Sequence, residues 1–462
     1  MDREELIRSV GQVVGPENTL SSETDLLLYG YDASLYRGKP DCIALPGSTE
    51  EVSRVVRFAR QAGVHVVARG SGTNLSGGTI PIQGGIVLHL SRMNKILEID
   101  IENQRAIVEP GVFTLSLKNQ LVRYGYLYQP DPASEKVSTL GGNVGENSGG
   151  PHCLKYGVTT NHVLGAEVVL YDGEIVWLGG KALDNPGYDL TGILVGSEGT
   201  LGIATKIVLR IMPRPEAVKT MLAIYNTLKD AGNTVSAIIA EGIIPATLEM
   251  LDKLTIKAVE ESIHAGFPLD AEAVLLIELD GLKDGIERLA GKIAEICKKN
   301  NVREVKVAKN EADRAQLWAG RKGAFGAVAR LRPNYLVCDG TVPRTKLPEV
   351  LSKVVEVGNK YNLAIANVFH AGDGNLHPLI LFDERNEEEL KRVRLAGSEI
   401  LKLCSDAGGT ISGEHGIGAE KIKEMFLVFT PEDMAAMKRV KKAFDPEDVY
   451  NPNKVIPKLE TS

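Results

Sequence analysis

Arg69-Gly-Ser-Gly-Thr-Asn-Leu-Ser-Gly-Gly78 follows directly after the apolar run Val64-His-Val-Val-Ala68. The run has the composition of a buried strand, and the stretch after it is a glycine-rich turn that begins with an unpaired arginine. Glycine tolerates positive φ, so backbone N–H groups can stay free, and the hydroxyls of Ser71 and Thr73 would be aimed at the same anion. The pattern favours a diphosphate-binding loop, although the segment taken alone equally suits a sharp connection between strands.

Two further glycine clusters strengthen this interpretation. The spacing of the first loop is neither Gly-x-Gly-x-x-Gly nor the phosphate loop that ends in Gly-Lys-Ser/Thr, which disfavours both common nucleotide-binding folds. Ser138-Thr-Leu-Gly-Gly-Asn-Val-Gly-Glu-Asn-Ser-Gly-Gly150 repeats the same chemistry, and Gly196-Ser-Glu-Gly-Thr-Leu-Gly-Ile203 adds a third loop. Three such loops indicate a phosphate-bearing ligand more readily than three simple turns.

Composition excludes several classes of protein. The 462 residues, with 43% hydrophobic and 24% charged content, suit a soluble protein of two or so domains. The net charge of −7 argues against a nucleic-acid partner, which usually needs a clustered basic face. No signal peptide or membrane-spanning run is recognisable, so we expect a cytoplasmic protein that meets a membrane only through a partner.

The cysteine pattern argues against a structural zinc site or an iron–sulfur cluster. The five cysteines are widely separated and form no Cys-x-x-Cys pair, so we expect reduced, mostly buried thiols. They are Cys42, Cys153, Cys297, Cys338 and Cys404.

The chain divides into two predicted domains and a tail. Residues 1–215 show a strand at Ile43, a helix over Glu50 to Ala62 and a series of short strands, and this domain closes at Met212-Pro-Arg-Pro-Glu216. Residues 216–425 alternate strands with amphipathic helices, and residues 426–462 could return to the first domain. Further strands are predicted at Gly85 to Leu90, Ile96 to Asp100, Arg105 to Val108, Val163 to Leu170, Lys219 to Ile224, Ala273 to Leu279, Tyr335 to Cys338, Ala364 to Phe369 and His377 to Phe382, and a helix at Thr114 to Tyr124.

The second domain carries a histidine and carboxylate set that suits a metal. His370-Ala-Gly-Asp-Gly-Asn-Leu-His377 lies between two strand patterns, so its Gly-Asp-Gly core predicts a hairpin turn with the two imidazoles opposite one another. Glu414 and His415 stand between glycines in Gly408-Gly-Thr-Ile-Ser-Gly-Glu-His-Gly-Ile-Gly418. Two histidines and a carboxylate suit Zn(II), Fe(II) or Mn(II). The economical assignment makes Glu414 the ligand and His415 the general base, and the residues alone leave the reverse assignment open.

Other candidate residues have simpler explanations when taken alone. Arg321, in Trp318-Ala-Gly-Arg-Lys322, has a planar fork suited to a carboxylate, yet by itself it reads as a surface arginine. The remaining histidines are explained as ordinary hydrogen-bonded side chains: His65, His89, His152, His162 and His264.

Together these motifs resemble the vanillyl-alcohol-oxidase-type FAD flavoproteins over almost the whole chain. The match is to their D-2-hydroxyacid dehydrogenase branch, which includes the glycolate oxidase catalytic subunit, D-lactate dehydrogenase and D-2-hydroxyglutarate dehydrogenase. The resemblance implies an α+β fold, with a two-subdomain FAD-binding domain of that type and an α+β substrate (cap) domain built on an antiparallel sheet.

The resemblance also assigns residues to FAD. The segment of Arg69 to Gly78 would hold the diphosphate, the other motifs would line the rest of the cofactor, and Asn451 would lie close to the flavin. Relatives that attach FAD covalently carry a histidine at the position of Thr73, so noncovalent FAD is expected. The implied cofactor-binding residues are Arg69, Gly70, Ser71, Gly72, Thr73, Asn74, Gly77, Pro130, Asp131, Ser138, Thr139, Gly141, Gly142, Asn143, Ser148, Gly149, Gly150, Glu198, Gly202, Ile203 and Asn451.

In the same way the family's metal ligands fall on His370, His377 and Glu414, its catalytic base on His415 and its substrate-carboxylate arginine on Arg321. Where the hydroxyglutarate enzymes grip a second carboxylate with a threonine and a lysine, this sequence has Phe325 and Val337. A second carboxylate buried there would have no partner, and burying an unpaired charge costs on the order of several kcal/mol. A dicarboxylate substrate is therefore disfavoured.

The expected function is oxidation of a short D-2-hydroxy monocarboxylate, D-lactate or glycolate, to the 2-oxo acid. Hydride would pass to the flavin N5, and electrons would then pass to a separate carrier, an electron-transferring flavoprotein or an iron–sulfur subunit. Two alternatives stay open: an oxidase that uses oxygen directly, and a non-catalytic flavin-binding subunit of a glycolate oxidase complex. The sequence leaves the oligomeric state open as well.

Overall fold

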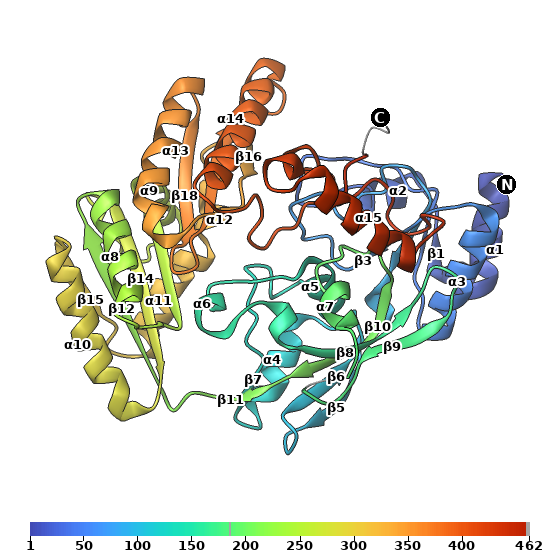
Figure 1. The fold of residues 1–462 in the computed structure, drawn as a ribbon, viewed down its shortest axis with the longest axis horizontal. Helices are drawn as coiled ribbons and strands as arrows, with labels where there is room; N and C mark the ends of the chain where they lie inside the picture. Colours follow the sequence, from blue (N-terminus) through green and yellow to red (C-terminus); the bar gives the residue numbers. More distant parts are fainter. Residues whose placement is uncertain (184–185, 459–462) are drawn as a thin grey trace. The chain divides into compact units, whose positions relative to one another are not determined.

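The computed structural model describes residues 1–183 and 186–458, so the end of the predicted C-terminal segment, 459–462, lies outside the described residues. Within them the chain forms two units (Figure 1). The first comprises Met1–Gly149, Val158–Arg214 and the chain from Glu414 onward. The second comprises Gly150–Gly157 and Pro215–Gly413.

The first unit is built on two sheets with different strand directions. In the four-stranded sheet, in the order β1-β2-β4-β3, strands β2, β4 and β3 are parallel. The five-stranded sheet, in the order β5-β6-β10-β8-β9, is antiparallel throughout. The strands are β1 Thr19–Leu20, β2 Cys42–Ala44, β3 Val66–Arg69, β4 Ile86–His89, β5 Ile96–Asp100, β6 Arg105–Val108, β8 Val163–Val169, β9 Ile175–Gly179 and β10 Ile203–Arg210, with the pair β7 Tyr126–Leu127 and β11 Met212–Pro213.

Short helices connect and cover these sheets. The α-helices are α1 Arg3–Val14, α2 Glu23–Leu28, α3 Thr49–Ala62, α4 Thr114–Val122, α5 Leu140–Glu146, α7 Leu190–Leu194 and α15 Pro431–Phe444. The 3-10 helices are η1 Pro16–Asn18, η2 Leu90–Arg92, η3 Thr159–Asn161 and η5 Lys423–Leu427.

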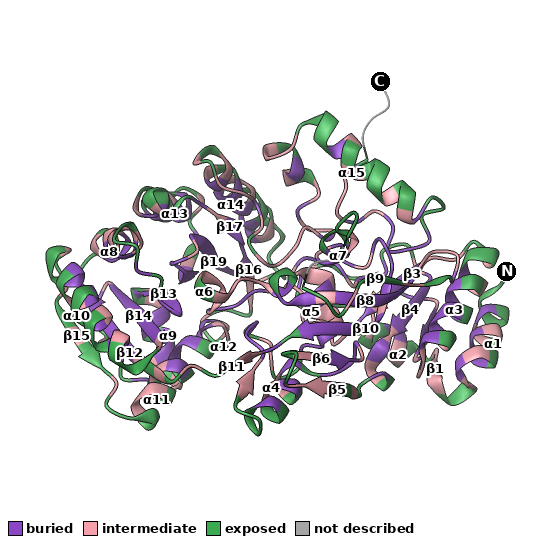
Figure 2. Cartoon of the chain, turned by 60° about the horizontal axis from the view of Figure 1, so that its bottom comes forward, coloured by how far each residue is buried: buried purple, intermediate pink, exposed green. Residues whose placement is uncertain are grey.

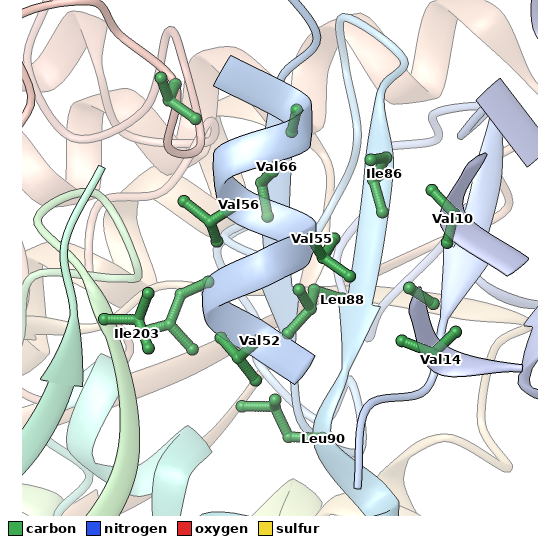
Figure 3. Packing of buried hydrophobic residues seen from close by; sticks show 14 of the residues in the cluster. Val10, Val14, Val52, Val55, Val56, Val66, Ile86, Leu88, Leu90 and Ile203 are labelled. Carbon is green, nitrogen blue, oxygen red and sulfur yellow. The ribbon is translucent and has the colours of Figure 1, made fainter. Parts of the chain in front are cut away.

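Helix α3 shows how the sequence fixes the first sheet. It begins because the Ser48 hydroxyl accepts a hydrogen bond from Glu51 N, and it ends at Gly63, whose φ of 64° is left-handed. Its buried residues recur at helical spacing, so one face of the helix is apolar. Figure 3 shows Val52, Val55 and Val56 packed with Val66, Ile86 and Leu88 of the strands.

The second unit packs its helices against one antiparallel sheet. The strand order is β15-β12-β14-β13-β18-β19-β16, and β17 pairs with β19. Its strands are β12 Ala217–Tyr225, β13 Thr247–Asp252, β14 Ala273–Gly281, β15 Glu304–Val307, β16 Asn334–Val337, β17 Gly340–Thr341, β18 Ala364–His370 and β19 Asn375–Phe382. Its helices are α6 Cys153–Tyr156, α8 Leu228–Ala240, α9 Lys253–Ser262, α10 Lys283–Lys299, α11 Glu311–Lys322, α12 Ala324–Val328, η4 Arg344–Lys346, α13 Leu347–Tyr361 and α14 Glu387–Asp406.

In both units the strands are largely buried, and the outer faces of helices such as α1 and α10 are exposed (Figure 2). No disulfide joins the described cysteines, and all of them but Cys153 are buried, as predicted. Among residues 1–183 and 186–458, no helix has the length and apolar character needed to span a membrane.

Several elements were not expected from the sequence, and two of them are informative. Strand β13 contains Glu249 and ends at Asp252, and these charges interrupt an apolar run that is nevertheless buried along its whole length. Helix α5 lies in the second glycine cluster. Glycine disfavours helices, so the spacing of Leu140 and Val144 did not by itself indicate one.

A substitution of Leu88 tests the packing of the first sheet. Leu88 lies on β4, and its fully buried side chain belongs to the same core cluster as the valines of α3. Leu88→Ala should lower the free energy of unfolding by about 2–5 kcal/mol, because it leaves a cavity in a close-packed core. Denaturant unfolding followed by circular dichroism measures this. The exposed Leu27 is the control: Leu27→Ala should change the same free energy by less than about 0.5 kcal/mol.

Candidate active site

The first glycine loop leaves β3 at Arg69 in the first unit. Contrary to the sequence prediction, this arginine is not unpaired. It is buried, and it donates from Nη2 to Tyr31 O at 2.8 Å and from Nη1 to Thr79 Oγ1 at 3.2 Å. A buried guanidinium requires acceptors for its N–H groups, and the chain itself supplies these two.

Side chains of the same loop are also engaged within the first unit. Ser71 Oγ donates to Val137 O at 2.5 Å, so the expectation that its hydroxyl proton is aimed at an anion is wrong. Asn74 Nδ2 donates to Asp32 Oδ2 at 2.6 Å. The loop therefore offers its main chain rather than these side chains, and the φ of 70° at Gly72 explains why glycine stands there.

The second and third glycine clusters take different local structures. The second is helix α5, which begins where Thr139 Oγ1 accepts from Gly142 N at 3.2 Å. A Cβ on Gly141 would lie 2.5 Å from Pro110 Cβ, so that glycine permits a close approach. The third cluster is a tight turn before β10, in which Glu198 adopts a φ of 51°.

These segments line one cavity in the first unit. At Gly145 no atom lies within 4 Å of where a Cβ would be, and at Gly199 the nearest is Ala68 Cβ at 3.6 Å. Main chain that faces open space suits a bound planar cofactor with phosphates. The predicted cofactor-binding residues that line the cavity are Arg69, Gly70, Thr139, Gly141, Gly142, Glu198, Gly202 and Ile203.

The other predicted cofactor-binding residues do not line this cavity. Asn451 still supports its wall, because Nδ2 donates to Gly78 O at 2.7 Å and to Glu198 O at 2.8 Å. The sequence analysis missed Leu90 and Pro110, which do line it. The residues outside the lining are Ser71, Gly72, Thr73, Asn74, Gly77, Pro130, Asp131, Ser138, Asn143, Ser148, Gly149, Gly150 and Asn451.

Two carboxyl groups, the half-buried Glu146 and the buried Glu198, form part of the cavity wall. Burial and then the neighbouring Glu198 charge hold the pKa of Glu146 well above its usual value of 4.5. Glu198 accepts from Ile417 N and Gly418 N at 2.7 Å each. Burial also raises the pKa of Glu198, but these two hydrogen bonds oppose that effect, and the pKa of Glu146 is raised further.

The pair also explains the glycine after His415. A Cβ on Gly416 would lie 2.7 Å from Glu198 Oε1 and 2.9 Å from Glu146 Oε2, and the φ of Gly416 is 80°. Lys421 Nζ donates to Gly416 O at 3.0 Å. Glu198 and Lys421 therefore fix the backbone of Gly416 to Gly418, directly after Glu414 and His415.

In the second unit the predicted hairpin is present, with β18 ending at His370 and β19 beginning at Asn375. The two histidines are not directly opposite, which corrects the prediction: His370 faces Asn375, and His377 faces Val368. They are diagonal neighbours on one face, with ring centroids 5.0 Å apart. The four-residue connection sets this register. Their ligand nitrogens lie within 4.8 Å of each other.

Asp339 is a buried carboxylate that the sequence analysis missed. Its Oδ1 lies 3.3 Å from His377 Nε2, and its Oδ2 accepts from Ser412 Oγ at 2.7 Å and from Gly413 N at 3.1 Å. Glu414 and His415 are the next residues of the chain after Gly413. No sequence signal marks Asp339, since its partners are distant in sequence.

Arg321 is not a surface arginine. Only 2% of it is exposed, and Glu249 accepts from its Nε at 2.6 Å. Glu249 also lies 2.9 Å, through Oε1, from His370 Nδ1. Burial raises the pKa of Glu249, but the charge of Arg321 and the hydrogen bonds from His370 and Arg321 outweigh it and lower that pKa.

The two residues expected to disfavour a second carboxylate lie in the same unit. The Phe325 ring is edge-on to the His377 ring, with centroids 6.1 Å apart, and it also contacts Tyr335. Val337 is buried on β16. The surroundings of His377 are thus apolar on the Phe325 side.

Comparisons with known proteins agree with this architecture. Residues 40–179 match the family described as FAD binding domain, and residues 214–455 match FAD linked oxidases, C-terminal domain. The glycolate oxidase subunit GlcD of Escherichia coli (strain K12) is 43% identical over 460 residues, 99% of this chain and 92% of that protein. A D-lactate dehydrogenase of Archaeoglobus fulgidus is 36% identical over 420 residues, 90% of this chain and 91% of that protein.

Among solved structures, substrate-bound p-cresol methylhydroxylase is similar with a TM-score of 0.82 at 18% identity, over 98% of this chain and 96% of that one. This likeness confirms the predicted vanillyl-alcohol-oxidase-type α+β fold.

Glu146 makes stability depend on pH in a defined direction. Because its pKa is raised on folding, the stability it contributes is complete below pH 4.5 and is lost as pH rises through the folded-state pKa. Glu146→Gln removes this titration. From pH 5 to 8, the free energy of unfolding of the parent should fall relative to the variant by at most about 1.4 kcal/mol per pH unit. Urea unfolding at each pH measures it, and parallel curves would contradict the assignment.

Proposed function

Because the chain belongs to the FAD-linked oxidase family, as an FAD-dependent oxidoreductase of the glycolate oxidase GlcD and D-lactate dehydrogenase type, we propose that it oxidises a short D-2-hydroxy monocarboxylate to the 2-oxo acid. D-Lactate and glycolate are the leading substrates. The proposal depends chiefly on one observation: an arginine, two histidines and an apolar ring meet in one buried cluster of the second unit.

Arg321 is the residue that we propose binds the substrate carboxylate. Its guanidinium has several N–H donors, and Glu249 engages those of Nε and Nη2. The Nη1 edge is the part that we assign to the substrate. The apolar contact of Phe325 with His377 supports a small substrate tail, because a second carboxylate there would be buried without a cation.

His370 and His377, with Glu414, are the proposed ligands of a divalent metal, either Zn(II), Fe(II) or Mn(II). The donor types fit, the two imidazoles share one face of a hairpin, and Glu414 directly follows Gly413, which is hydrogen-bonded to Asp339 beside His377. When bound, the metal supplies a Lewis acid to the 2-hydroxyl group, and noncovalent FAD supplies the hydride acceptor. His415 takes the hydroxyl proton as general base.

Electrons then leave to a separate carrier, for which an electron-transferring flavoprotein or an iron–sulfur subunit is the candidate. A cytoplasmic location, with membrane contact only through that partner, fits this arrangement.

D-Lactate, added anaerobically to the purified, FAD- and metal-loaded protein, should bleach the absorbance of the oxidised flavin at about 450 nm. L-Lactate should leave this absorbance unchanged. D-Selective bleaching, or bleaching by glycolate, supports the proposal. A flavin that stays oxidised with both acids contradicts it and favours a non-catalytic subunit. Peroxide release in air without an added acceptor would identify an oxidase instead.

His415→Ala should lower the turnover number by about 10²- to 10⁴-fold, because it removes the proposed base, while FAD content stays normal. Stopped-flow reduction with D-lactate measures the rate of flavin reduction directly. His264→Ala, at an exposed histidine of the second unit, is the control and should retain the parent rate. Normal turnover in His415→Ala would exclude His415 as the base.

A further inference from the structure

We propose that Glu249 is a positioning residue for both His370 and Arg321, so that one carboxylate prepares the metal ligand and the substrate-binding arginine together. This inference rests on the proposed function, and it adds a residue to it. Glu249 was not recognised in the sequence, because a glutamate in the middle of a buried strand has no motif around it.

The geometry is that of a carboxylate enclosed by two partners. Glu249 is 1% exposed, Arg321 2% and His370 5%, so little water reaches any of them. Arg321 Nε donates to Glu249 Oε2 at 2.6 Å, and Nη2 lies 2.5 Å from the same oxygen. His370 Nδ1 lies 2.9 Å from Oε1 and 3.0 Å from Oε2.

These contacts decide which nitrogen of His370 carries its proton. An ionised carboxylate only accepts hydrogen bonds, so Nδ1, which faces both oxygens, must be the protonated nitrogen. The other ring nitrogen, Nε2, then keeps its lone pair for a metal ion. Arg321 Nη2 lies 3.4 Å from the same Nδ1, and as two donors these atoms cannot bond to each other, so both depend on Glu249 as acceptor.

The charge of Glu249 also makes the cluster compatible with a cation. A divalent metal on His370 would otherwise lie close to the positive guanidinium of Arg321 in a site of low dielectric constant. The carboxylate between the two offsets this repulsion. It also holds the guanidinium by Nε and Nη2, so the plane of the fork is fixed before any substrate arrives.

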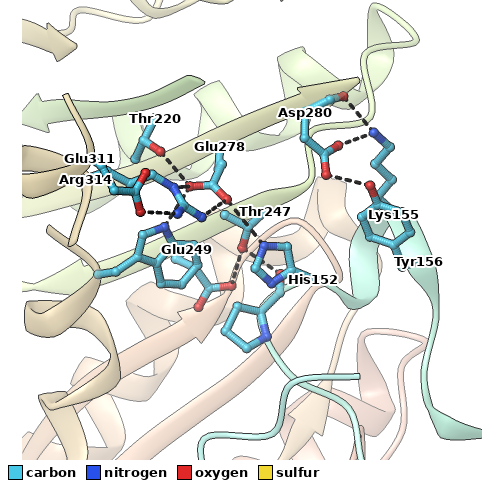
Figure 4. Close-up of polar contacts among 12 residues, drawn as sticks. His152, Lys155, Tyr156, Thr220, Thr247, Glu249, Glu278, Asp280, Glu311 and Arg314 are labelled. Atoms are coloured by element: carbon cyan, nitrogen blue, oxygen red, sulfur yellow. Dashed lines mark hydrogen bonds and ion pairs between the residues drawn. The ribbon is translucent and has the colours of Figure 1, made fainter. Parts of the chain in front are cut away.

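A second glutamate and arginine pair in the same sheet provides a matched control. Glu278 lies on β14, next to β13, and Arg314 lies on α11, two turns before Arg321. Glu278 accepts from Arg314 Nε at 2.8 Å and from Trp318 Nε1 at 2.7 Å, and it is 2% exposed. Figure 4 shows Glu278 with Arg314, and Thr247 of β13 beside Glu249. Glu278 is as buried as Glu249, although 30% of the Arg314 side chain is exposed, and none of the Glu278 contacts named above involves His370 or Arg321.

The experiment compares Glu249→Gln with Glu278→Gln in the full-length, FAD-loaded protein, using two readouts other than turnover. The first is Co²⁺ affinity in chelator-buffered titrations, followed by the visible absorption of the bound ion. The second is the histidine Nδ1–H signal in ¹⁵N-histidine NMR spectra recorded without metal. Glu249→Gln should weaken Co²⁺ binding by about 10- to 100-fold and remove or shift one Nδ1–H signal, whereas Glu278→Gln should change neither.

Equal Co²⁺ affinity and unchanged Nδ1–H signals in a folded Glu249→Gln protein would overturn the inference. A parent protein that binds no Co²⁺ would instead overturn the metal part of the proposed function, and the NMR comparison would still decide the role of Glu249. If Glu249→Gln does not fold, Glu249→Asp keeps the charge but withdraws the carboxylate by one methylene. It should weaken Co²⁺ binding too, and parent-like affinity in that variant would count against the inference.

Discussion

The buried carboxylate of Glu198 accepts two backbone N–H groups, those of Ile417 and Gly418, at the wall of the cavity in the first unit. A carboxylate buried away from water is costly unless it is hydrogen-bonded, so these bonds fix the conformation of the segment that donates them. The same wall is tied to the end of the described chain, because Asn451 and Lys454 both donate to the carbonyl oxygen of Gly78. Segments that are hundreds of residues apart in the sequence are therefore held around one cavity by a few charged and amide groups.

These groups perturb one another in opposite directions. Burial lowers the pKa of Lys454 to about 8, while it raises that of Glu146. The raised pKa of Glu146 and the nearby Lys454, which donates to Gly78 O of the wall, both reduce the negative charge that the two carboxyl groups would otherwise give it. Such a wall suits a flavin, whose ring is largely apolar and whose charge changes on reduction.

Charge pairing organises the second unit as well. Helix α11 presents Arg314 and Arg321 to the sheet, and each meets a glutamate of a different strand, Glu278 on β14 and Glu249 on β13. Removing one member of the fully buried Arg321–Glu249 pair costs about 3–5 kcal/mol, so this pair fixes the helix on the sheet. The pair with Glu249 does more, because the same carboxylate also contacts His370. The same contacts of Glu249 therefore stabilise the fold and orient residues of the candidate site.

The sequence by itself determined the local elements and the residue types of the site. Alternation and helical spacing located strands such as Ile96–Asp100 and Arg105–Val108 at their observed residues, because these patterns reflect which face is buried. The Gly-Asp-Gly hairpin between His370 and His377 was also predictable, since turn chemistry is local. Only the tertiary structure decided that the two histidines are diagonal, that Arg69 is already paired, and that Glu249, Asp339 and Glu146 belong to the sites. The physical reason is that a buried charge is defined by its partners, and here those partners come from segments far away in the sequence.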